Sequence, residues 1–204
     1  MPIYFIAFVS HIALLYFSVK IPNKRVSFLL AVIAVLPLCL VAGLRDASVG
    51  TDTSAYPLRC FYASQYYSLT GAMGACSDQE PLFVILFWIL GRLTGDFHAV
   101  LFLCEAIVLL PYILVVRKLY PRGYPVVGFF LCFVVFGYTL NIIRQCLATS
   151  MLVMMLYELF REKRVPAIVY LALAVGFHKM SIIGLLIWII YISCFNRRQE
   201  RSYK

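Results

Sequence analysis

Charged side chains are scarce in this chain: only 13% of its 204 residues are Asp, Glu, Lys or Arg, whereas 63% are hydrophobic. Soluble domains usually contain roughly 25% charged residues. The mean hydropathy of +0.91 reflects the same deficit. This composition excludes an ordinary soluble domain and predicts a polytopic, all-α membrane protein, with residues 1–204 forming a single integral membrane domain.

Acidic residues are rarer than basic ones, at 9 against 18, so the net charge is +9. In a soluble protein such an excess would suggest binding to nucleic acid. Here the basic residues instead occur in short clusters between apolar runs, where they determine the topology of membrane helices. We therefore expect no nucleic-acid partner.

Metal-binding motifs are missing as well. The seven cysteines are scattered along the chain, and no two of them form a CxxC pair. We therefore expect no metal site, and no cofactor is implied. Cys60 and Cys76 share one polar loop. They are either free thiols or, if that loop faces an oxidising compartment, the two halves of a disulfide.

Apolar runs divide the chain into about seven expected transmembrane helices and one shorter segment. A run of this kind, at about 1.5 Å per residue, crosses or nearly crosses a hydrocarbon core of roughly 30 Å. The run over residues 81–93 is shorter, and we expect a re-entrant or interfacial helix there. The expected crossings cover residues 3–19, 26–43, 97–116, 124–140, 146–160, 165–177 and 180–195.

The distribution of basic residues supports seven crossings. If residues 81–93 do not cross, 13 of the 18 basic residues fall on one side of the membrane. The positive-inside rule assigns that side to the cytoplasm, which puts the N-terminus outside and a basic tail, residues 196–204, inside. The 13 basic residues on this side are Lys20, Lys24, Arg25, Arg117, Lys118, Arg122, Arg161, Lys163, Arg164, Arg197, Arg198, Arg201 and Lys204.

A polar stretch over residues 44–97 forms an outer-face loop in this topology. We expect interfacial helices within it, one of them over residues 54–69, and a flexible loop over 71–78. Its first part is dense in charge, hydroxyl groups and glycine, which favours a ligand surface, although a solvated loop explains it equally well. Its aromatic residues suit either an interface belt or stacking on sugar rings.

The same topology brings polar residues from three helix junctions to one leaflet. Snorkelling cations at helix ends explain one or two of them. A basic, partly sheltered pocket that binds an anionic headgroup explains the whole set better, because this is the side that the topology rule depletes of cations. The residues are Arg45, Asp46, Asp52, Glu80, Asn141, Arg144, Gln145, His178 and Lys179.

Four short motifs contain most of these polar residues, and together they resemble the EpsG-like family. This family is related to Wzy-type polysaccharide polymerases. The motifs are Gly43-Leu44-Arg45 with Val49-Gly50-Thr51-Asp52-Thr53 and Tyr56; Glu80-Pro81-Leu82-Phe83; Asn141-Ile142-Ile143-Arg144-Gln145 with Ala148; and Phe177-His178-Lys179. Each motif is weak alone, but their order and spacing together are fairly specific. Members of this family are usually longer, so the resemblance implies a truncated product, a short member of the family or a subunit that depends on a partner.

The resemblance implies an architecture similar to membrane-embedded glycosyltransferases and a location in the bacterial cytoplasmic (inner) membrane. The implied activity joins lipid-linked oligosaccharide repeat units at the outer face of that membrane. The implied partners are a polyprenyl-diphosphate-linked oligosaccharide, membrane lipid and other exopolysaccharide assembly proteins.

Glycosyl transfer from a polyprenyl diphosphate requires cations that stabilise the leaving group and a carboxylate that accepts the proton of the acceptor hydroxyl. Asp52 is the first candidate for the carboxylate, since Gly50 and Thr51 let the backbone approach a ligand. The candidate catalytic residues are Asp52, Asp46, Glu80 and His178. The candidate substrate-binding residues are Arg45, Thr51, Tyr56, Arg144, Gln145 and Lys179.

Structural roles compete with these assignments. Asp46 could pair with Arg45, while Asp52 and Glu80 could each cap the helix that follows. Two other functions also compete: a transporter or flippase of lipid-linked sugar, and a non-catalytic scaffold of an exopolysaccharide assembly complex. Transporters usually place polar sites near the bilayer midplane and often contain internal repeats, and neither feature is evident here.

Overall fold

The computed structural model describes residues 2–202, and the side chains of residues 2–193. All regular elements within this range are helices, which confirms the all-α prediction. They are α1 (Pro2–Lys20), α2 (Lys24–Ile33), α3 (Leu36–Gly43), α4 (Pro57–Tyr66), α5 (Leu69–Ala75), α6 (Pro81–Thr94), α7 (Phe97–Leu119), α8 (Tyr124–Thr139), α9 (Ile143–Phe160), α10 (Arg164–Phe177), the 3₁₀ helix η1 (Lys179–Ile182) and α11 (Ile183–Ser202).

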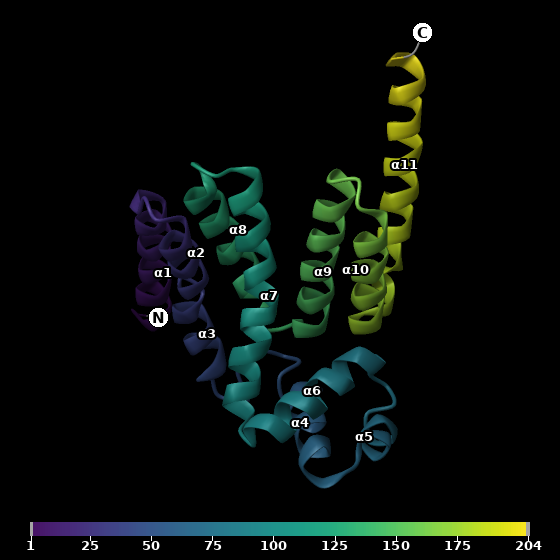
Figure 1. Ribbon diagram of the computed structural model, residues 1–204. Coiled ribbons are helices and arrows are strands. Elements are labelled where there is room, and N and C mark those ends of the chain that lie inside the picture. Colours follow the sequence, from purple (N-terminus) through teal and green to yellow (C-terminus); the bar gives the residue numbers. More distant parts are fainter. Residues whose placement is uncertain (1, 203–204) are drawn as a thin grey trace.

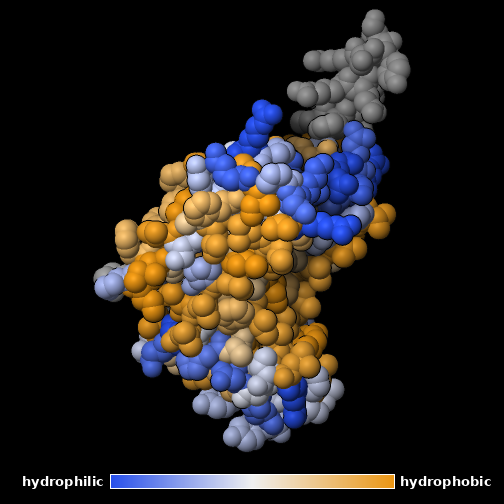
Figure 2. Space-filling view, turned by 60° about the vertical axis from the view of Figure 1, so that its left-hand side comes forward, coloured by the Kyte–Doolittle hydropathy of each residue, from blue (hydrophilic) through white to orange (hydrophobic). Residues whose placement is uncertain are grey.

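Four helical segments are long and apolar enough to cross a membrane: Pro2–Lys20, Lys24–Gly43, Phe97–Leu119 and Ile143–Phe160. Four shorter apolar helices accompany them, so a total of seven crossings stays a prediction. The space-filling view shows a hydrophobic band across the visible face of the molecule, between two more hydrophilic ends (Figure 2). A membrane protein produces this distribution because lipid tails contact its hydrophobic band and water contacts its ends.

The helices run back and forth between these two ends. The α1–α2, α7–α8 and α9–α10 turns lie at one end (Figure 1). The α8–α9 junction and η1 lie toward the opposite end, where α4, α5 and α6 form a cap over the bundle. We call these three helices the cap. Its residues belong to the polar stretch that the sequence placed on the outer face, so the ribbon arrangement agrees with the expected order of junctions.

The second apolar run is broken, although the sequence predicted one helix over 26–43. Helix α2 ends at Ile33 and α3 begins at Leu36. Pro37 lies in the first turn of α3. Proline has no N–H to donate, and its ring collides with the carbonyl four residues earlier, which here belongs to Ile33. The break therefore occurs where proline requires it.

The cap differs from the sequence prediction in one segment. Residues 71–78 were expected to be a flexible loop, but α5 extends over Leu69–Ala75, and the Ser68 side chain accepts a hydrogen bond from the Gly71 N–H at 3.3 Å. The prediction was wrong because it gave weight to the two glycines and missed this N-cap. Cys60 and Cys76 both lie buried in the cap as free thiols.

One apolar core connects α1, α3, α7, α8 and α9 and continues into the cap. A smaller cluster, formed by Met155, Leu159, Ala167 and Trp188, joins α9, α10 and α11. The predicted basic tail, residues 196–204, coincides with the end of α11 and the residues after it, and its side chains lie outside the described part of the chain.

Candidate functional site

Glu80 lies at the centre of a cluster formed by three helix junctions. It occupies the N-cap position of α6, but its side chain makes no capping hydrogen bond. Instead its Oε2 accepts a hydrogen bond from Arg144 Nη1 at 2.8 Å, while Oε1 lies 3.0 Å from His178 Nδ1. Oε1 also accepts a longer hydrogen bond from the Lys179 N–H at 3.4 Å. The sequence alternative, a cap for the helix opened by Pro81, is therefore wrong.

Arg144 is held from two directions at the first turn of α9. Its guanidinium lies 4.3 Å from the centre of the Tyr56 ring, in addition to the ion pair with Glu80. The side chains of Arg144 and Glu80 are only 19% and 10% exposed. A cation stacked on an aromatic face in a partly desolvated position has a fixed orientation. The cluster is therefore a preformed arrangement of charges.

The break between α10 and η1 places His178 beside Glu80. Helix α10 ends at Phe177, and His178 adopts an extended backbone conformation with φ −156° and ψ 114°. This confirms that the polar His178–Lys179 pair divides one apolar run into two short helices. The Lys179 side chain is exposed. It provides a positive charge at the open side of the cluster.

The loop that follows α3 is fastened to the α8–α9 junction. The Thr51 N–H donates a hydrogen bond to Asn141 Oδ1 at 3.2 Å. Gly50 has φ +92°, and a Cβ atom there would lie 1.6 Å from the Leu140 carbonyl oxygen. Only glycine permits this approach, because any other side chain would collide with the Leu140 backbone. The close approach predicted for Gly50 is thus toward the protein's own backbone.

Arg45 is buried rather than open to the outer surface, with 5% of its area exposed. Its Nη2 donates a hydrogen bond to Thr53 Oγ1 at 3.3 Å, and Thr53 donates in turn to the Leu140 carbonyl at 3.4 Å. Burial lowers the pKa of Arg45, and the charge of Glu105 opposes this shift. Among the described side chains, Arg45 forms no ion pair with Glu105, so only the charge of Glu105, and no direct contact, relates the two groups.

Glu105 was left unexplained by the sequence. Its side chain is fully buried in α7, and neither carboxylate oxygen has a hydrogen-bond partner within the described residues. Arg45 Nε and Nη1 also lack partners there. Arg45 and Glu105 are thus two buried polar side chains with unpartnered atoms within the described residues, which no short motif in the sequence could have indicated.

The remaining candidate residues lie around the cluster at its surface. Asp46 is exposed, and its Oδ1 accepts a hydrogen bond from the Ser48 N–H at 2.8 Å, so the alternative of pairing with Arg45 is wrong. Asp52 is half-buried, and its side chain has no hydrogen bond or ion pair to the described residues. Tyr56, rather than Asp52, occupies the N-cap position of α4. Gln145 is exposed.

The environment of Glu80 favours its charged form. Burial by itself would raise the pKa of this carboxyl group. Backbone hydrogen bonds and the nearby Arg144 guanidinium outweigh that effect, so the pKa of Glu80 lies below its usual value. Glu80 is therefore a weak base and a strong acceptor, which suits it to hold Arg144 and His178 in place.

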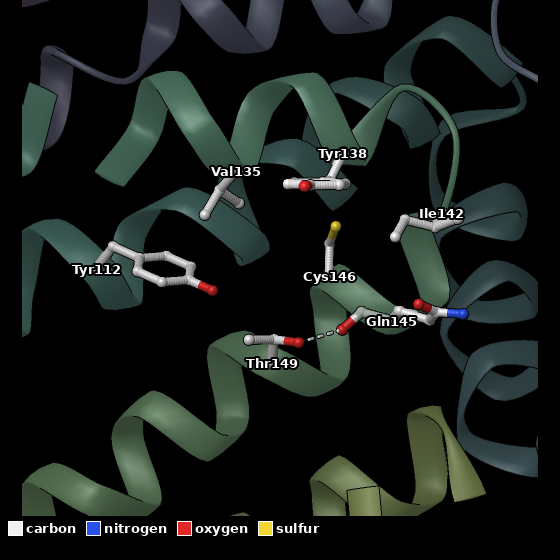
Figure 3. A pocket seen from close by; sticks show the side chains of 7 residues that line it. All are labelled: Tyr112, Val135, Tyr138, Ile142, Gln145, Cys146 and Thr149. Carbon is white, nitrogen blue, oxygen red and sulfur yellow. Dashed lines mark hydrogen bonds between the residues drawn. The ribbon is translucent and has the colours of Figure 1, made fainter. Parts of the chain in front are cut away.

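An apolar pocket of about 230 Å³ is lined in part by Gln145, the residue that follows Arg144 in the sequence. It lies between α7, α8 and α9, and Figure 3 shows the Tyr112 and Thr149 side chains across the pocket from Tyr138. The Thr149 hydroxyl donates its hydrogen bond to the Gln145 carbonyl at 2.7 Å. The residues that line this apolar pocket are Tyr112, Val135, Tyr138, Ile142, Gln145, Cys146 and Thr149.

Sequence reasoning missed Thr53 as a functional candidate, and it gave no role to Asn141. Thr53 links Arg45 to the Leu140 carbonyl, whereas Asn141 holds Thr51. Both residues position the loop rather than present a charge. The signal that could have found them is the repetition of hydrogen-bonding side chains at two helix junctions that the topology places on the same side.

Comparison with known proteins identifies a family for this chain. No curated protein and no solved structure matches the chain. A family model described as the EpsG family matches residues 28–199. The matched region contains Arg45, Glu80, Arg144 and His178, and it covers most of the sequence. The chain therefore belongs to the EpsG family, a family of Wzy-like polymerases.

Proposed function

We propose that this protein polymerises lipid-linked oligosaccharide repeat units in exopolysaccharide biosynthesis, by glycosyl transfer at the outer face of the bacterial cytoplasmic membrane. The observation that carries the proposal is the convergence of Arg144, His178 and Lys179 on Glu80. Membership of the EpsG family supports a polymerase of this kind. The donor is a polyprenyl-diphosphate-linked oligosaccharide, and the acceptor is a sugar hydroxyl of a second lipid-linked chain.

In the proposed step, the acceptor hydroxyl oxygen forms a bond to the anomeric carbon of the donor sugar. The bond between that carbon and the diphosphate oxygen breaks, and the polyprenyl diphosphate leaves with the electron pair. Arg144 and the exposed Lys179 are suited to bind the diphosphate, because preorganised cations stabilise the negative charge that develops on it. His178 lies beside them through its contact with Glu80.

The proton of the acceptor hydroxyl passes to a carboxylate. Asp52 remains the first candidate for this base, because it is half-buried and its side chain is not engaged by the described residues. Asp46 is the second candidate, at the exposed side of the same loop. Glu80 is less suited, since its ion pair with Arg144 stabilises the carboxylate and makes it a weaker base. Its proposed role is to position Arg144 and His178.

The apolar pocket lined by Gln145 provides room for part of the lipid. Its walls come from α7, α8 and α9, and Gln145 follows Arg144 in the first turn of α9. A polyprenyl diphosphate needs this combination, because its phosphates require cations and its first isoprene units require apolar contacts. Tyr112 and Tyr138 supply large apolar faces for such contacts.

The experiment that tests the proposal is Arg144→Ala in a cell that makes the polymer. We expect loss of high-molecular-weight polysaccharide and accumulation of single lipid-linked repeat units outside the membrane. Arg59→Ala is the matched control, because Arg59 forms an exposed ion pair with Asp78 within the cap. The amount of each variant in the membrane is measured by immunoblotting, so that loss of protein is not mistaken for loss of activity.

Two results would contradict the proposal. If Arg144→Ala accumulates in the membrane and polymer of normal length persists, the protein is a scaffold of the assembly complex. If the lipid-linked repeat units accumulate on the cytoplasmic side instead, the protein moves them across the membrane as a flippase. Protection of the repeat units from a glycosidase added outside distinguishes the two sides.

A further inference from the structure

A charged pocket of about 280 Å³ is lined by residues of α1, α2, α7, α8 and the α7–α8 turn. The α1–α2 and α7–α8 turns lie at the end of the bundle opposite the cap (Figure 1). The Glu80 cluster lies toward the other end of these helices, so the two sites are separate. The pocket is lined by Val19, Lys24, Ser27, Arg117, Lys118, Pro121 and Tyr124.

Arg117 is fixed in this pocket by three neighbours. Its Nη2 donates a hydrogen bond to Ser27 Oγ at 3.1 Å. Its guanidinium also lies 5.3 Å from the centre of the Phe28 ring and 5.9 Å from that of Tyr124. The Tyr124 hydroxyl is hydrogen-bonded to Ser18 in α1, which fixes the ring. Arg117 is therefore held in one orientation at the pocket wall instead of extending freely into solvent.

No carboxylate among the described side chains balances the charge of this pocket. Arg117, Lys24 and Lys118 contribute three positive charges, and no acidic residue lines the pocket. Among the described side chains, no Asp or Glu forms an ion pair with any of the three. A guanidinium has five N–H donors, and the Ser27 hydroxyl accepts from one nitrogen only. The pocket therefore offers a preoriented, uncompensated set of donors for an anion.

The surroundings of the pocket favour an anion that carries apolar chains. Val26, Phe28 and Leu29 follow Lys24 on the first turns of α2, and all three are exposed, at 48%, 45% and 56%. In a membrane these side chains contact lipid tails next to the cationic pocket. Binding sites for drug-sized ligands usually measure roughly 300–1,000 Å³. The pocket is thus suited to a phosphate-sized headgroup.

We propose that this pocket binds the headgroup phosphate of an anionic phospholipid in the leaflet opposite the Glu80 cluster. The Arg117 fork contacts the phosphate oxygens, Lys24 and Lys118 add point charges, and the acyl chains lie along the exposed apolar face of α2. Basic pockets between membrane helices bind anionic headgroups by this chemistry. The positive-inside rule assigns this end to the cytoplasm, where each basic residue near an anionic leaflet is favoured. The proposal is independent of the polymerase function.

The test is native mass spectrometry of the full chain released from nanodiscs that contain equal amounts of phosphatidylglycerol and phosphatidylcholine. The wild-type protein is expected to retain one phosphatidylglycerol in preference to phosphatidylcholine. Arg117→Gln is expected to lower that preference about fivefold, the effect of one basic residue at an anionic surface. Arg117→Lys retains the charge without the fork and is expected to give an intermediate value.

Arg164→Gln is the matched control, because Arg164 is exposed at the start of α10, at the same end of the bundle but outside the pocket. Equal losses in Arg117→Gln and Arg164→Gln would show general charge attraction and overturn the proposal. A preference unchanged by Arg117→Gln would overturn it as well. Thermal unfolding in detergent reports whether each variant is folded.

Two further measurements complete the test. Because Arg117 packs on Phe28 and Tyr124, its replacement could disturb the fold. The double variant Lys24→Gln/Lys118→Gln changes only exposed side chains, and it is expected to lower the phosphatidylglycerol preference by more than either single change. Addition of millimolar inorganic phosphate distinguishes the source of the anion. Release of phosphatidylglycerol by free phosphate would show a soluble-anion site and overturn the lipid proposal.

Discussion

Glu80 and Arg144 form an ion pair of 2.8 Å, although 64 residues separate them in the sequence. The pair connects the start of α6 to the start of α9 and fixes the cap against the bundle. The same carboxylate contacts His178 at 3.0 Å, so one acidic side chain organises three helix junctions. Removal of this one charge therefore has consequences for both stability and the arrangement of the cations.

Glu80→Gln is predicted to destabilise the protein and to abolish polymer synthesis. The change leaves the partly buried Arg144 without its counter-ion, and a hydrogen bond to a charged partner contributes about 1.5–3 kcal/mol. Thermal unfolding of the purified protein in detergent measures the first effect, and the length distribution of the polymer measures the second. Asp78→Asn is the control, because it removes the exposed partner of Arg59, and exposed pairs contribute at most about 1 kcal/mol. Equal destabilisation by the two changes would contradict a special role for Glu80.

The contribution of Glu80 to stability is predicted to disappear at acid pH. Its folded-state pKa lies below the ordinary value of 4.5, so the folded protein holds this proton less tightly than the unfolded chain does. The stabilisation is therefore complete above pH 4.5 and is lost as the pH falls through the folded-state pKa. The difference in melting temperature between wild type and Glu80→Gln measures it, because other carboxylates contribute equally to both proteins. A difference that grows below pH 4.5 would contradict this assignment.

Gly50→Ala is predicted to displace the loop that carries Thr51 and Asp52. The backbone at Gly50 has φ +92°, and an added Cβ would lie 1.6 Å from the Leu140 carbonyl oxygen. Strain of this kind costs on the order of 1–3 kcal/mol, even before the backbone shifts to relieve the collision. We expect lower thermal stability and less polymer. Gly74→Ala is the control, because nothing lies within 4 Å of the position and its φ is not positive.

The sequence predicted the membrane class, the break at His178 and the gathering of Glu80, Arg144 and His178 at one end. These predictions depend on hydropathy, on charge counts and on the cost of polar groups in apolar helices, all of which are local or additive properties of a chain. The end of the helical bundle at which these polar residues lie could therefore be predicted from runs and clusters. The N-cap of α7 by Asp96, which accepts a hydrogen bond from the Ala99 N–H at 3.0 Å, was predictable for the same reason.

Pairings between side chains were not predictable. The sequence left Arg45 to bind either Asp46 or a ligand, whereas in the structure it donates a hydrogen bond to Thr53, and the charge of the buried Glu105 affects its pKa. Glu105 follows Arg45 by 60 residues, and no spacing rule connects positions so far apart. The choice between capping and ion pairing for Glu80 likewise depends on how α6 packs against α9, which is a property of the whole fold.

Arg45 and Glu105 are predicted to be energetically coupled. Arg45→Met removes the buried cation whose charge acts on the Glu105 carboxylate, and a buried polar group left without a partner costs about 1–3 kcal/mol. Glu105→Leu removes that carboxylate, so the double variant is expected to be more stable than Arg45→Met alone. A double-mutant cycle from thermal unfolding in detergent measures the coupling. Additive effects of the two changes would show that the residues act independently.

The last prediction concerns the side of the membrane on which the cluster lies. Single cysteines at Ser77, Asn141 and Met180 are expected to react with an impermeant maleimide added outside the cell, in a background without native cysteines. All three positions are exposed, and they belong to the cap, the α8–α9 junction and η1. Lys163→Cys, in the turn between α9 and α10, is the inside control and is expected to react only after the membrane is permeabilised.

This experiment decides whether one composite site exists at the outer face. The cation cluster requires Asn141 and Met180 to lie on the same side as the cap, because Arg144 and His178 both contact Glu80. Labelling of Lys163→Cys from outside, with protection of the other three, would invert the topology and place the cluster in the cytoplasm. Glycosyl transfer at the outer face would then be excluded, although the contacts around Glu80 would be unchanged. The direction of labelling therefore tests the location of the reaction separately from the geometry of the site.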